Sequence, residues 1–209
     1  MDCTISGTAR GMMWIDVNRL PKKSTQYNIS MKCATINVQR AQLSRDVLQA
    51  DQAPDQPVRP QALRLHMKDM GIHFCGCQES PCVEDGVVRD GFLVVGTANK
   101  EQTLGVSLLV NMDAPSAAGP GGSRSLRRGD VRVLHRSLRV LVVRISTVCL
   151  NETVFVIHAP YKGHKTVPAG RWWADLYELA KKWTPTIILG DCNANLSYRP
   201  TCWRPSSCL

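Results

Sequence analysis

Four short apolar runs in this chain each end in polar residues of types that bind phosphate or metal ions. The endings are Asn37 after Cys33–Ile36, Gln78 and Glu79 after Ile72–Cys77, His158 after Val154–Ile157, and Gly190, Asp191, Cys192 and Asn193 after Thr186–Leu189. Short apolar runs bounded by turn residues are typical of buried strands. Strands that deliver Asn, Glu, His and Asp side chains at the same end build a site at one rim of a sheet. The pattern therefore predicts a polar site assembled from four strand ends.

The four endings also match the sequence motifs of a known family, and they occur in the same order. They read Thr35-Ile36-Asn37-Val38, Gly76-Cys77-Gln78-Glu79-Ser80, Ile157-His158-Ala159-Pro160 and Leu189-Gly190-Asp191-Cys192-Asn193-Ala194. This ordered set resembles the endonuclease/exonuclease/phosphatase superfamily, which includes pancreatic deoxyribonuclease, abasic-site endonucleases and the endonucleases of non-LTR retrotransposons. The His-Ala-Pro step and the pair Trp172-Trp173 are closest to the retrotransposon-type endonucleases. The resemblance covers roughly residues 30–196.

The resemblance implies an α/β fold, the two-sheet αββα sandwich of the deoxyribonuclease-like type. In the family, a final strand beyond the Gly-Asp-x-Asn box carries an Asp-His pair, and its His is usually assigned to activate the attacking water. Here only 16 residues follow Asn193, and they contain neither Asp nor His. We therefore expect a sandwich that is incomplete at its C-terminus. Such a sandwich would have an open sheet edge, which favours self-association.

The chemistry that the resemblance implies is hydrolysis of a phosphodiester with the help of a divalent cation. Glu79 would be the metal ligand and Asn37 would help to fix the metal or the phosphate; Mg²⁺ or Mn²⁺ is the expected cofactor, since Mg²⁺ takes one or two carboxylates and keeps several waters. Asp191 and Asn193 would orient the nucleophile and hold the phosphate. His158 would contact phosphate and serve in proton transfer. Taken singly, a Glu after a strand is usually a solvated end and a lone His is usually structural, so the assignment rests on the joint order.

Three classes of function are compatible with this pattern. The first is a metal-dependent endonuclease acting on nucleic acid, with DNA favoured over RNA; without the Asp-His pair we expect its activity to be weak or absent. The second is a non-catalytic remnant that binds nucleic acid. The third is a phosphoesterase acting on a small phosphorylated molecule or a lipid headgroup. The sequence alone leaves open whether the chain is an enzyme.

Basic residues give the chain a formal net charge of +9, from 26 Lys and Arg against 17 Asp and Glu. Residues 122–146 hold a single acid, Asp130, and seven arginines: Arg124, Arg127, Arg128, Arg132, Arg136, Arg139 and Arg144. A basic stripe of this kind neutralises phosphates and releases counterions, which drives sequence-independent binding to nucleic acid. An equally good interpretation is an ordinary half-exposed strand, because the arginines alternate with apolar residues.

Length and composition predict one domain inside the cell. At 209 residues and 44% hydrophobic content, the chain can bury a core of its own. No apolar run reaches the roughly 18 residues that a membrane span needs, so we expect no membrane partner. Residues 1–20 lack the continuous apolar segment of a secretory signal. We accordingly expect an intracellular protein, in the nucleus or the cytoplasm.

The nine cysteines are odd in number and scattered, which does not favour a disulfide framework. Three of them, Cys75, Cys77 and Cys82, lie close together in the sequence. Structural zinc prefers four ligands and Cys-x2-4-Cys spacing, so we expect no zinc here. Alternation along a strand instead places Cys75 and Cys77 on one face, as small buried side chains.

The chain divides into a poorly patterned extension over residues 1–30, the partial endonuclease-like domain over 31–197 and an irregular tail over 198–209. Within the domain we expect a stiff proline-rich loop over 51–60, a buried strand over 104–110 and a flexible loop over 113–122. Residues 131–147 should form one long strand or two short ones.

Two segments have the apolar period of a helix. Ala62–Met70 places Leu63, Met67 and Met70 on one face, with Gly71 as its C-terminal cap. Pro168–Trp183 carries an apolar stripe of Trp172, Leu176, Leu179 and Trp183, and its proline suits a first turn. This second helix lies between the strands that end in His158 and Asp191. It therefore predicts a strand-helix-strand unit of a layered α/β fold.

Overall fold

The computed structural model describes residues 2–9, 12–19, 28–38, 59–80, 86–97, 105–119, 122–161 and 168–193, and for 2–9, 12–19 and 59 the backbone alone. The expected loop over residues 51–58, Cys82 and the expected tail over 198–209 lie outside these residues. So does the stretch 194–209 on which the expectation of an incomplete sandwich depends.

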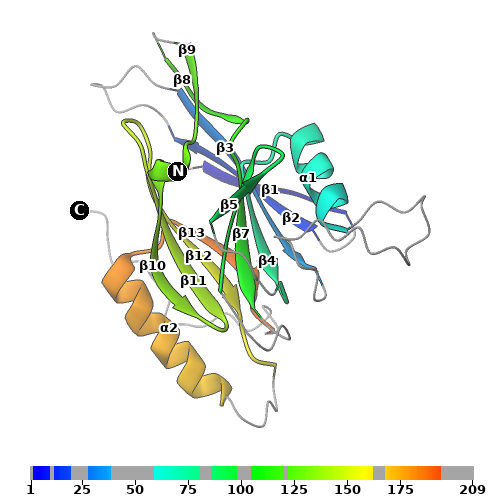
Figure 1. The fold of residues 1–209 in the computed structure, drawn as a ribbon. Helices are drawn as coiled ribbons and strands as arrows, with labels where there is room; N and C mark the ends of the chain where they lie inside the picture. The colour runs from blue at the N-terminus through cyan, green and yellow to red at the C-terminus, as the bar shows by residue number, and fades with distance from the viewer. Residues whose placement is uncertain are drawn as a thin grey trace, which may run out of the picture.

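The larger of two sheets runs in the order β1-β2-β3-β4-β7-β6-β5, and the hairpin β8–β9 attaches to the start of β3 (Figure 1). Strands β3 and β4 are parallel, while the other neighbours pair antiparallel. The bounds are β1 Asp2–Ala9, β2 Met12–Arg19, β3 Asn28–Asn37, β4 Phe74–Gln78, β5 Val87–Arg89, β6 Phe92–Gly96, β7 Val106–Asn111, β8 Pro115–Gly119 and β9 Gly122–Ser125.

The smaller sheet runs in the order β10-β11-β12-β13. A short 3-10 turn, η1 Arg128–Asp130, leads into β10 Val131–Ser137, which pairs antiparallel with β11 Val140–Ser146. Strand β12, Asn151–His158, pairs antiparallel with β11 and parallel with β13, Ile187–Asp191. Helix α2, Ala169–Trp183, connects the two parallel strands, which confirms the strand-helix-strand unit. Residues 131–147 thus contain two short strands.

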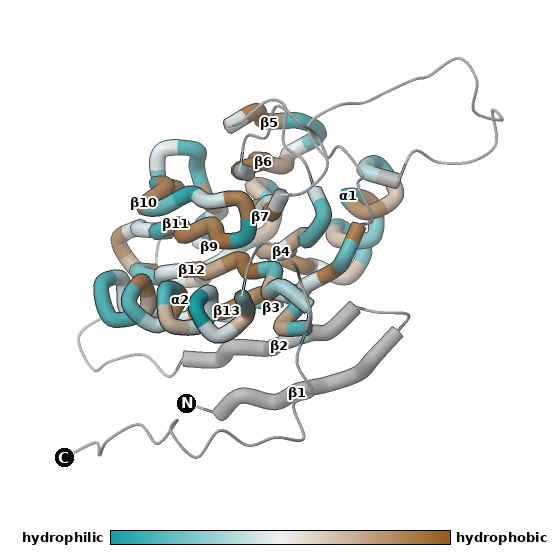
Figure 2. Tube along the Cα trace, turned by 90° about the horizontal axis from the view of Figure 1, so that it is seen from below, coloured by the Kyte–Doolittle hydropathy of each residue, from teal (hydrophilic) through white to brown (hydrophobic). Residues whose placement is uncertain are grey.

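Two packed sheets with a helix outside each give the molecule four layers, as Figures 1 and 2 show. The inner faces of the sheets share one apolar cluster, to which Phe74, Leu108, Leu141 and Val156 contribute. Helix α1, Arg59–Asp69, packs on the outer face of the larger sheet through Leu63 and Met67. Helix α2 covers the outer face of the smaller sheet. The predicted two-sheet αββα sandwich is therefore confirmed.

Helix α2 forms as its apolar stripe predicts. Trp172 and Leu176 are buried against β11 and β12, and Leu179 and Trp183 are partly buried in the same cluster. The helix ends at Thr184, whose backbone is left-handed and whose N–H donates to the Ala180 carbonyl at 2.8 Å. The stripe is therefore core.

Helix α1 confirms the helix predicted over Ala62–Met70 with one exception. It begins at Arg59, inside the expected proline-rich loop, and Gly71 follows it with a φ of 63° as a C-terminal cap requires. Met70, expected on the buried face, is 42% exposed. The helix has ended at Asp69, so its period no longer directs Met70 toward the sheet.

Two stretches expected to lack regular structure contain strands. Residues 1–30 hold β1, β2 and the start of β3, and the expected loop over 113–122 contains β8 and the first residue of β9. In each case two strands form a hairpin, β1 with β2 and β8 with β9. One strand of each hairpin also pairs with β3: β2 pairs along β3, and Ala117 and Ala118 of β8 pair with Ile29 and Asn28. A local alternation of polar and apolar residues does not show these pairings.

The two neighbouring cysteines of β4 are core residues. Cys75 and Cys77 are fully buried among Ala34, Met67 and Leu109, and their sulfurs lie 3.9 Å apart on one face of the strand. Burial raises the pKa of the Cys77 thiol well above its usual value. The prediction that both are small buried side chains is confirmed.

Candidate functional site

The four predicted strand ends meet at one rim of the sandwich. In the larger sheet Asn37 is the register partner of Gln78, and in the smaller sheet His158 is the partner of Asp191. Strand β13 packs face to face on β3 and β4. The approach is close because β4 has a glycine there: a Cβ on Gly76 would lie 2.6 Å from the Cβ of Leu189. Both pairs of strand ends therefore point the same way from sheets in direct contact.

In the larger sheet, the two polar strand ends are joined by a hydrogen bond. The Asn37 amide Nδ2 donates to Glu79 Oε1 at 3.1 Å. Glu79 has a left-handed backbone, with a φ of 52°, which directs it away from the strand after the buried Gln78. The Gln78 side chain is held inside by Thr35, to whose hydroxyl its Nε2 donates at 3.0 Å. The buried glutamine thus anchors the strand end, while the carboxylate of Glu79 is half-buried at the rim.

In the smaller sheet, Asp191 and Asn193 form a compact turn. Asp191 Oδ1 accepts a hydrogen bond from the Asn193 backbone N–H at 2.9 Å. The Asn193 side chain in turn donates from Nδ2 to the Ala159 carbonyl at 2.6 Å, and the Ala159 N–H donates to the Asp191 carbonyl at 2.8 Å. These bonds connect the segment after β13 to the segment after β12. The positions of the aspartate and of His158 are therefore coupled.

His158 is buried at the end of β12, with 6% of its surface exposed. Burial lowers the pKa of its imidazole, and the positive charge of Arg139 lowers it further, while the carboxylates of Asp191 and Glu79 act in the opposite direction. The two carboxylates thus lie within electrostatic reach of the ring from both sheets. With a pKa below its ordinary value, the imidazole is neutral at neutral pH and able to accept a proton.

Arg139 is a site residue that the sequence did not single out. It lies in the turn between β10 and β11 and is only 7% exposed. Its Nη1 donates to the His158 carbonyl at 3.3 Å, and its own carbonyl accepts from the His158 N–H at 2.9 Å. Burial lowers the pKa of the guanidinium, whereas the negative charge of Glu79 raises it. A buried cation therefore lies beside the histidine.

The donor set of the rim suits a magnesium-type cation better than zinc. Among the described residues there is no group of three or more His, Cys, Asp or Glu side chains placed to hold a metal ion. Glu79 and Asn37 instead offer a carboxylate and an amide side by side. One or two carboxylates with several retained waters is how Mg²⁺ usually binds, and all-oxygen donors suit Mg²⁺ or Mn²⁺. Glu79 and Asn37 therefore fit the expected cation.

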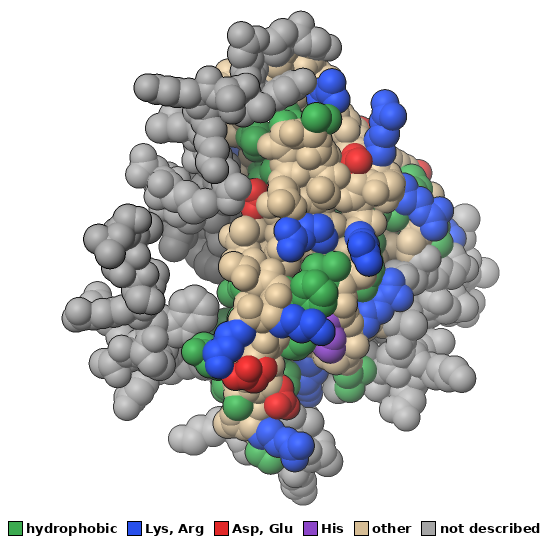
Figure 3. Space-filling model, turned by 90° about the vertical axis from the view of Figure 1, so that its left-hand side faces the viewer, with side chains coloured by type: hydrophobic (Ala, Val, Ile, Leu, Met, Phe, Trp, Pro, Cys, Tyr) green, Lys and Arg blue, Asp and Glu red, His purple; other side chains and the backbone are tan. Residues whose placement is uncertain are grey.

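The seven arginines of residues 122–146 do not form one continuous stripe. Arg124, Arg127, Arg128, Arg132 and Arg136 are exposed, Arg144 is half-buried and donates to Asn151 Oδ1 at 2.9 Å, and Arg139 belongs to the rim described above. Strand β10 forms an edge of the smaller sheet, and Figure 3 shows basic side chains gathered on one flank of the molecule. The two interpretations of the sequence, a basic stripe and an ordinary half-exposed strand, therefore each describe some of these arginines.

No family model matches the chain, and no curated protein matches it. Among solved structures, it is similar to the endonuclease domain of TRAS1, a telomere-specific non-LTR retrotransposon, with 16% sequence identity and a TM-score of 0.49. The match covers 79% of this chain and 60% of that one, so the chain spans about three fifths of the length of that structure. A likeness this remote leaves the function to be argued from the site. No helix among the described residues is long and apolar enough to cross a membrane.

Proposed function

We propose that the chain is a metal-dependent phosphodiester hydrolase that acts on nucleic acid, with the rim formed by the ends of β3, β4, β12 and β13 as its reaction centre. The observation that carries the proposal is the convergence of Glu79, His158 and Asp191 from both sheets at that rim. Three groups that can bind metal, accept a proton and orient water would thereby act on one phosphate. Asn37 and Asn193 complete the set of five residues.

Each side chain of the rim has a distinct part in this proposal. Glu79 and Asn37 would hold Mg²⁺ or Mn²⁺, which supplies charge neutralisation at the phosphate when bound. Asp191 accepts the Asn193 N–H through Oδ1, so Oδ2 would be the oxygen that orients the attacking water. The neutral imidazole of His158 would accept a proton from that water and, as the imidazolium, return it to the leaving oxygen. The Arg139 guanidinium beside it offers positive charge to the phosphate.

Nucleic acid is the favoured substrate because of the basic flank. The exposed arginines on β9, η1 and β10 are a surface that binds a polyanion, and a small phosphorylated molecule or a lipid headgroup does not need so extended a surface. The same surface favours the second candidate, a non-catalytic protein that binds nucleic acid. DNA is preferred to RNA as substrate.

Nicking of supercoiled plasmid with and without Mg²⁺ tests the proposal. Nicking is expected to be weak, should require the cation and should fall to background in His158→Ala, because a general acid or base usually contributes about 10²–10⁴-fold. Asp191→Ala and Glu79→Gln should reduce it to background, whereas Asp175→Asn, at an exposed acid on α2, should leave it unchanged. Equal nicking by wild type and Asp191→Ala would remove the rim from the reaction. Binding of DNA with no nicking by any form would favour the second candidate, and a matched RNA substrate shows the preference between the nucleic acids.

A further inference from the structure

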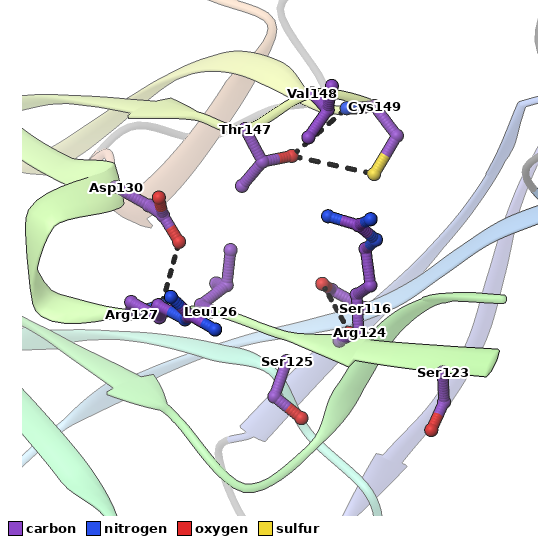
Figure 4. A pocket seen from close by; sticks show the side chains of 10 residues that line it. All are labelled: Ser116, Ser123, Arg124, Ser125, Leu126, Arg127, Asp130, Thr147, Val148 and Cys149. Carbon is purple, nitrogen blue, oxygen red and sulfur yellow. Dashed lines mark hydrogen bonds between the residues drawn. The ribbon is translucent and has the colours of Figure 1, made fainter. Parts of the chain in front are cut away.

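A polar cavity lies at the rim of the sandwich opposite the candidate site. It has a volume of about 600 Å³ and is lined by the β8–β9 hairpin, η1 and the turn between β11 and β12 (Figure 4). The strand register shows that this cavity is far from the candidate site. The turn between β11 and β12 connects Ser146 to Asn151, which pair at one end of these two strands. The candidate site is next to Val140 and Ile157, which pair at the other end. We call this cavity the distal pocket.

The side chains of the distal pocket suit an oxyanion. Two arginines line it, Arg124 and Arg127, and Figure 4 shows the Arg124 side chain extending from β9 toward Thr147 and Cys149. Ser123 and Ser125 add hydroxyl groups along the β9 side. Guanidinium and hydroxyl donors around one space are the groups that bind phosphate oxygens, and two guanidiniums oppose a metal cation.

The pocket also contains one acid, Asp130, which is engaged locally. Its Oδ2 accepts a hydrogen bond from the Arg127 backbone N–H at 2.7 Å, which fixes the start of η1. The Thr147 hydroxyl likewise accepts from the Leu150 N–H at 2.9 Å and shapes the opposite wall. Both groups serve the architecture of the pocket, and the arginines leave its formal charge positive.

A basic strand edge connects the distal pocket to the candidate site. Strand β10 begins directly after η1 at the pocket and ends at Ser137, which pairs with Val140 near His158. Its seven residues span about 20 Å at about 3.3 Å per residue. Arg132 and Arg136 are exposed along it, and Figure 3 shows basic side chains over this flank. The bulge between Val133 and His135 places the two arginines on opposite faces of this edge strand. A phosphate chain that followed the edge of β10 from one rim to the other would therefore have an arginine on each side of it.

We propose that the distal pocket binds a backbone phosphate of a nucleic-acid strand that runs along β10 to the candidate site. The inference rests on the proposed function for the identity of the ligand as nucleic acid, and it adds a binding site remote from the reaction centre. Holding the strand at both rims would orient it across the site. It would also make affinity depend on strand length, because a strand too short to span β10 engages one rim at a time.

Two cysteines of the chain report on the two rims separately. Cys149 lines the distal pocket and Cys192 lies between Asp191 and Asn193; both are partly exposed. The test is alkylation of the whole chain with N-ethylmaleimide, read peptide by peptide by mass spectrometry, with and without a single-stranded DNA of about 15 nucleotides, within the range that single-strand binding sites occupy. We expect the DNA to slow alkylation at both cysteines. Protection of Cys192 without Cys149 would overturn this inference and leave the proposed function intact.

Charge-removing variants provide the second measurement. For a single strand, each lost phosphate contact lowers the slope of log affinity against log salt by about 0.7. Because Arg124 and Arg127 would hold the same phosphate, Arg124→Gln with Arg127→Gln should lower the slope by about 0.7 and abolish protection of Cys149, while Cys192 stays protected. The control Lys68→Gln, at a lysine of α1 that does not line the pocket, should leave both readouts unchanged. A double variant that behaves like this control would overturn the inference, and failure of the wild-type chain to bind DNA would overturn it together with the proposed function.

Discussion

Asn193 combines a left-handed backbone with two short hydrogen bonds at the end of β13. Its φ is 43°, a region in which residues other than glycine are uncommon and asparagine is among the best tolerated. Its backbone N–H binds Asp191 and its side chain binds the Ala159 carbonyl. The asparagine therefore holds the turn that presents Asp191, whatever it does toward phosphate. Glu79, with a φ of 52°, has the same strained backbone in the other sheet.

The two parts of the Asn193 contribution can be separated by a pair of substitutions. Asn193→Gly removes the side-chain hydrogen bond, worth about 0.5–1.5 kcal/mol, but keeps a residue suited to positive φ. Asn193→Ala removes the same bond and adds about 1–2 kcal/mol for a left-handed alanine. Urea unfolding should therefore rank the free energy of unfolding as wild type, then Gly, then Ala. Equal stability of the two variants would show that the turn relaxes out of the left-handed region.

Histidines whose pKa is lowered in the folded state should make the fold less stable in acid. The pKa of His158 is lowered mainly by burial, and the same cause lowers the pKa of His73 and of His135. A lowered folded-state pKa means that the unfolded chain binds the proton more tightly. The stability from these groups is therefore fully present above the unfolded pKa of about 6.5 and is lost as the pH falls from there toward the folded value.

The measurement is the free energy of unfolding between about pH 7.5 and pH 5, on either side of the unfolded histidine pKa. His158→Gln should flatten part of the decline. A wild-type curve that is level across this interval would contradict the lowered pKa values.

At the level of single residues, the sequence predicted five polar side chains at the rim but not the buried guanidinium of Arg139 beside them. Asn37, Glu79, His158, Asp191 and Asn193 could be singled out because each follows an apolar run. Arg139 could not, since an arginine in a turn between two strands is normally solvated and its burial depends on the contact of that turn with His158. Met70 was wrongly expected on the buried face of α1, because the period of a helix says little about the residue after its last turn.

At the scale of the elements, the close packing of β4 against β13 depends on the absence of a side chain at Gly76. A Cβ on Gly76 would lie 2.6 Å from the Leu189 Cβ and 3.2 Å from Val156 Cγ1, both in the smaller sheet. Gly76→Ala should separate the sheets locally and lower the free energy of unfolding by about 1–3 kcal/mol, as overpacked cores do. The position is next to the site, so Mg²⁺-dependent nicking should fall as well.

A glycine elsewhere in the chain provides the matched control. Gly170 lies in the first turn of α2, where an added Cβ meets nothing within 4 Å. Gly170→Ala should raise stability by up to about 1 kcal/mol through helix propensity. Chemical denaturation should therefore show a lower free energy of unfolding for Gly76→Ala and a higher one for Gly170→Ala. A neutral Gly76→Ala would mean that the two sheets are not in close contact there.

The sequence predicted strands and helices where their own residues specify them. The four apolar runs and the stripe of α2 have the period of the element that they form. Four strands, β1, β2, β8 and β9, were not predicted, because they are defined by pairing with β3 or with one another. Some of these partners, such as β3 and β8, are far apart in the sequence. Self-association through a sheet edge stays a prediction: among the described residues, β13 pairs with β12 alone.

For the whole molecule, the consequence of the fold is that no single sheet holds the site. Asn37 and Glu79 belong to the larger sheet, while His158, Asp191 and Arg139 belong to the smaller one. The inner apolar cluster that joins the sheets is therefore also what assembles the rim. A cation or phosphate bound there contacts both layers and should stabilise their packing.

Binding of Mg²⁺ should consequently protect the chain against unfolding. By mass action, a ligand at 100 times its Kd stabilises the native state by about 2.7 kcal/mol, which raises the melting temperature measurably. Glu79→Gln keeps the size of the side chain and its place beside Asn37 but removes the charge that would hold the cation. We expect it to abolish the Mg²⁺-dependent rise, whereas Asp175→Asn, which removes an exposed charge on α2, should retain it. If the rise persists undiminished in Glu79→Gln, the cation binds elsewhere, and the metal-assisted mechanism loses the residue on which it depends.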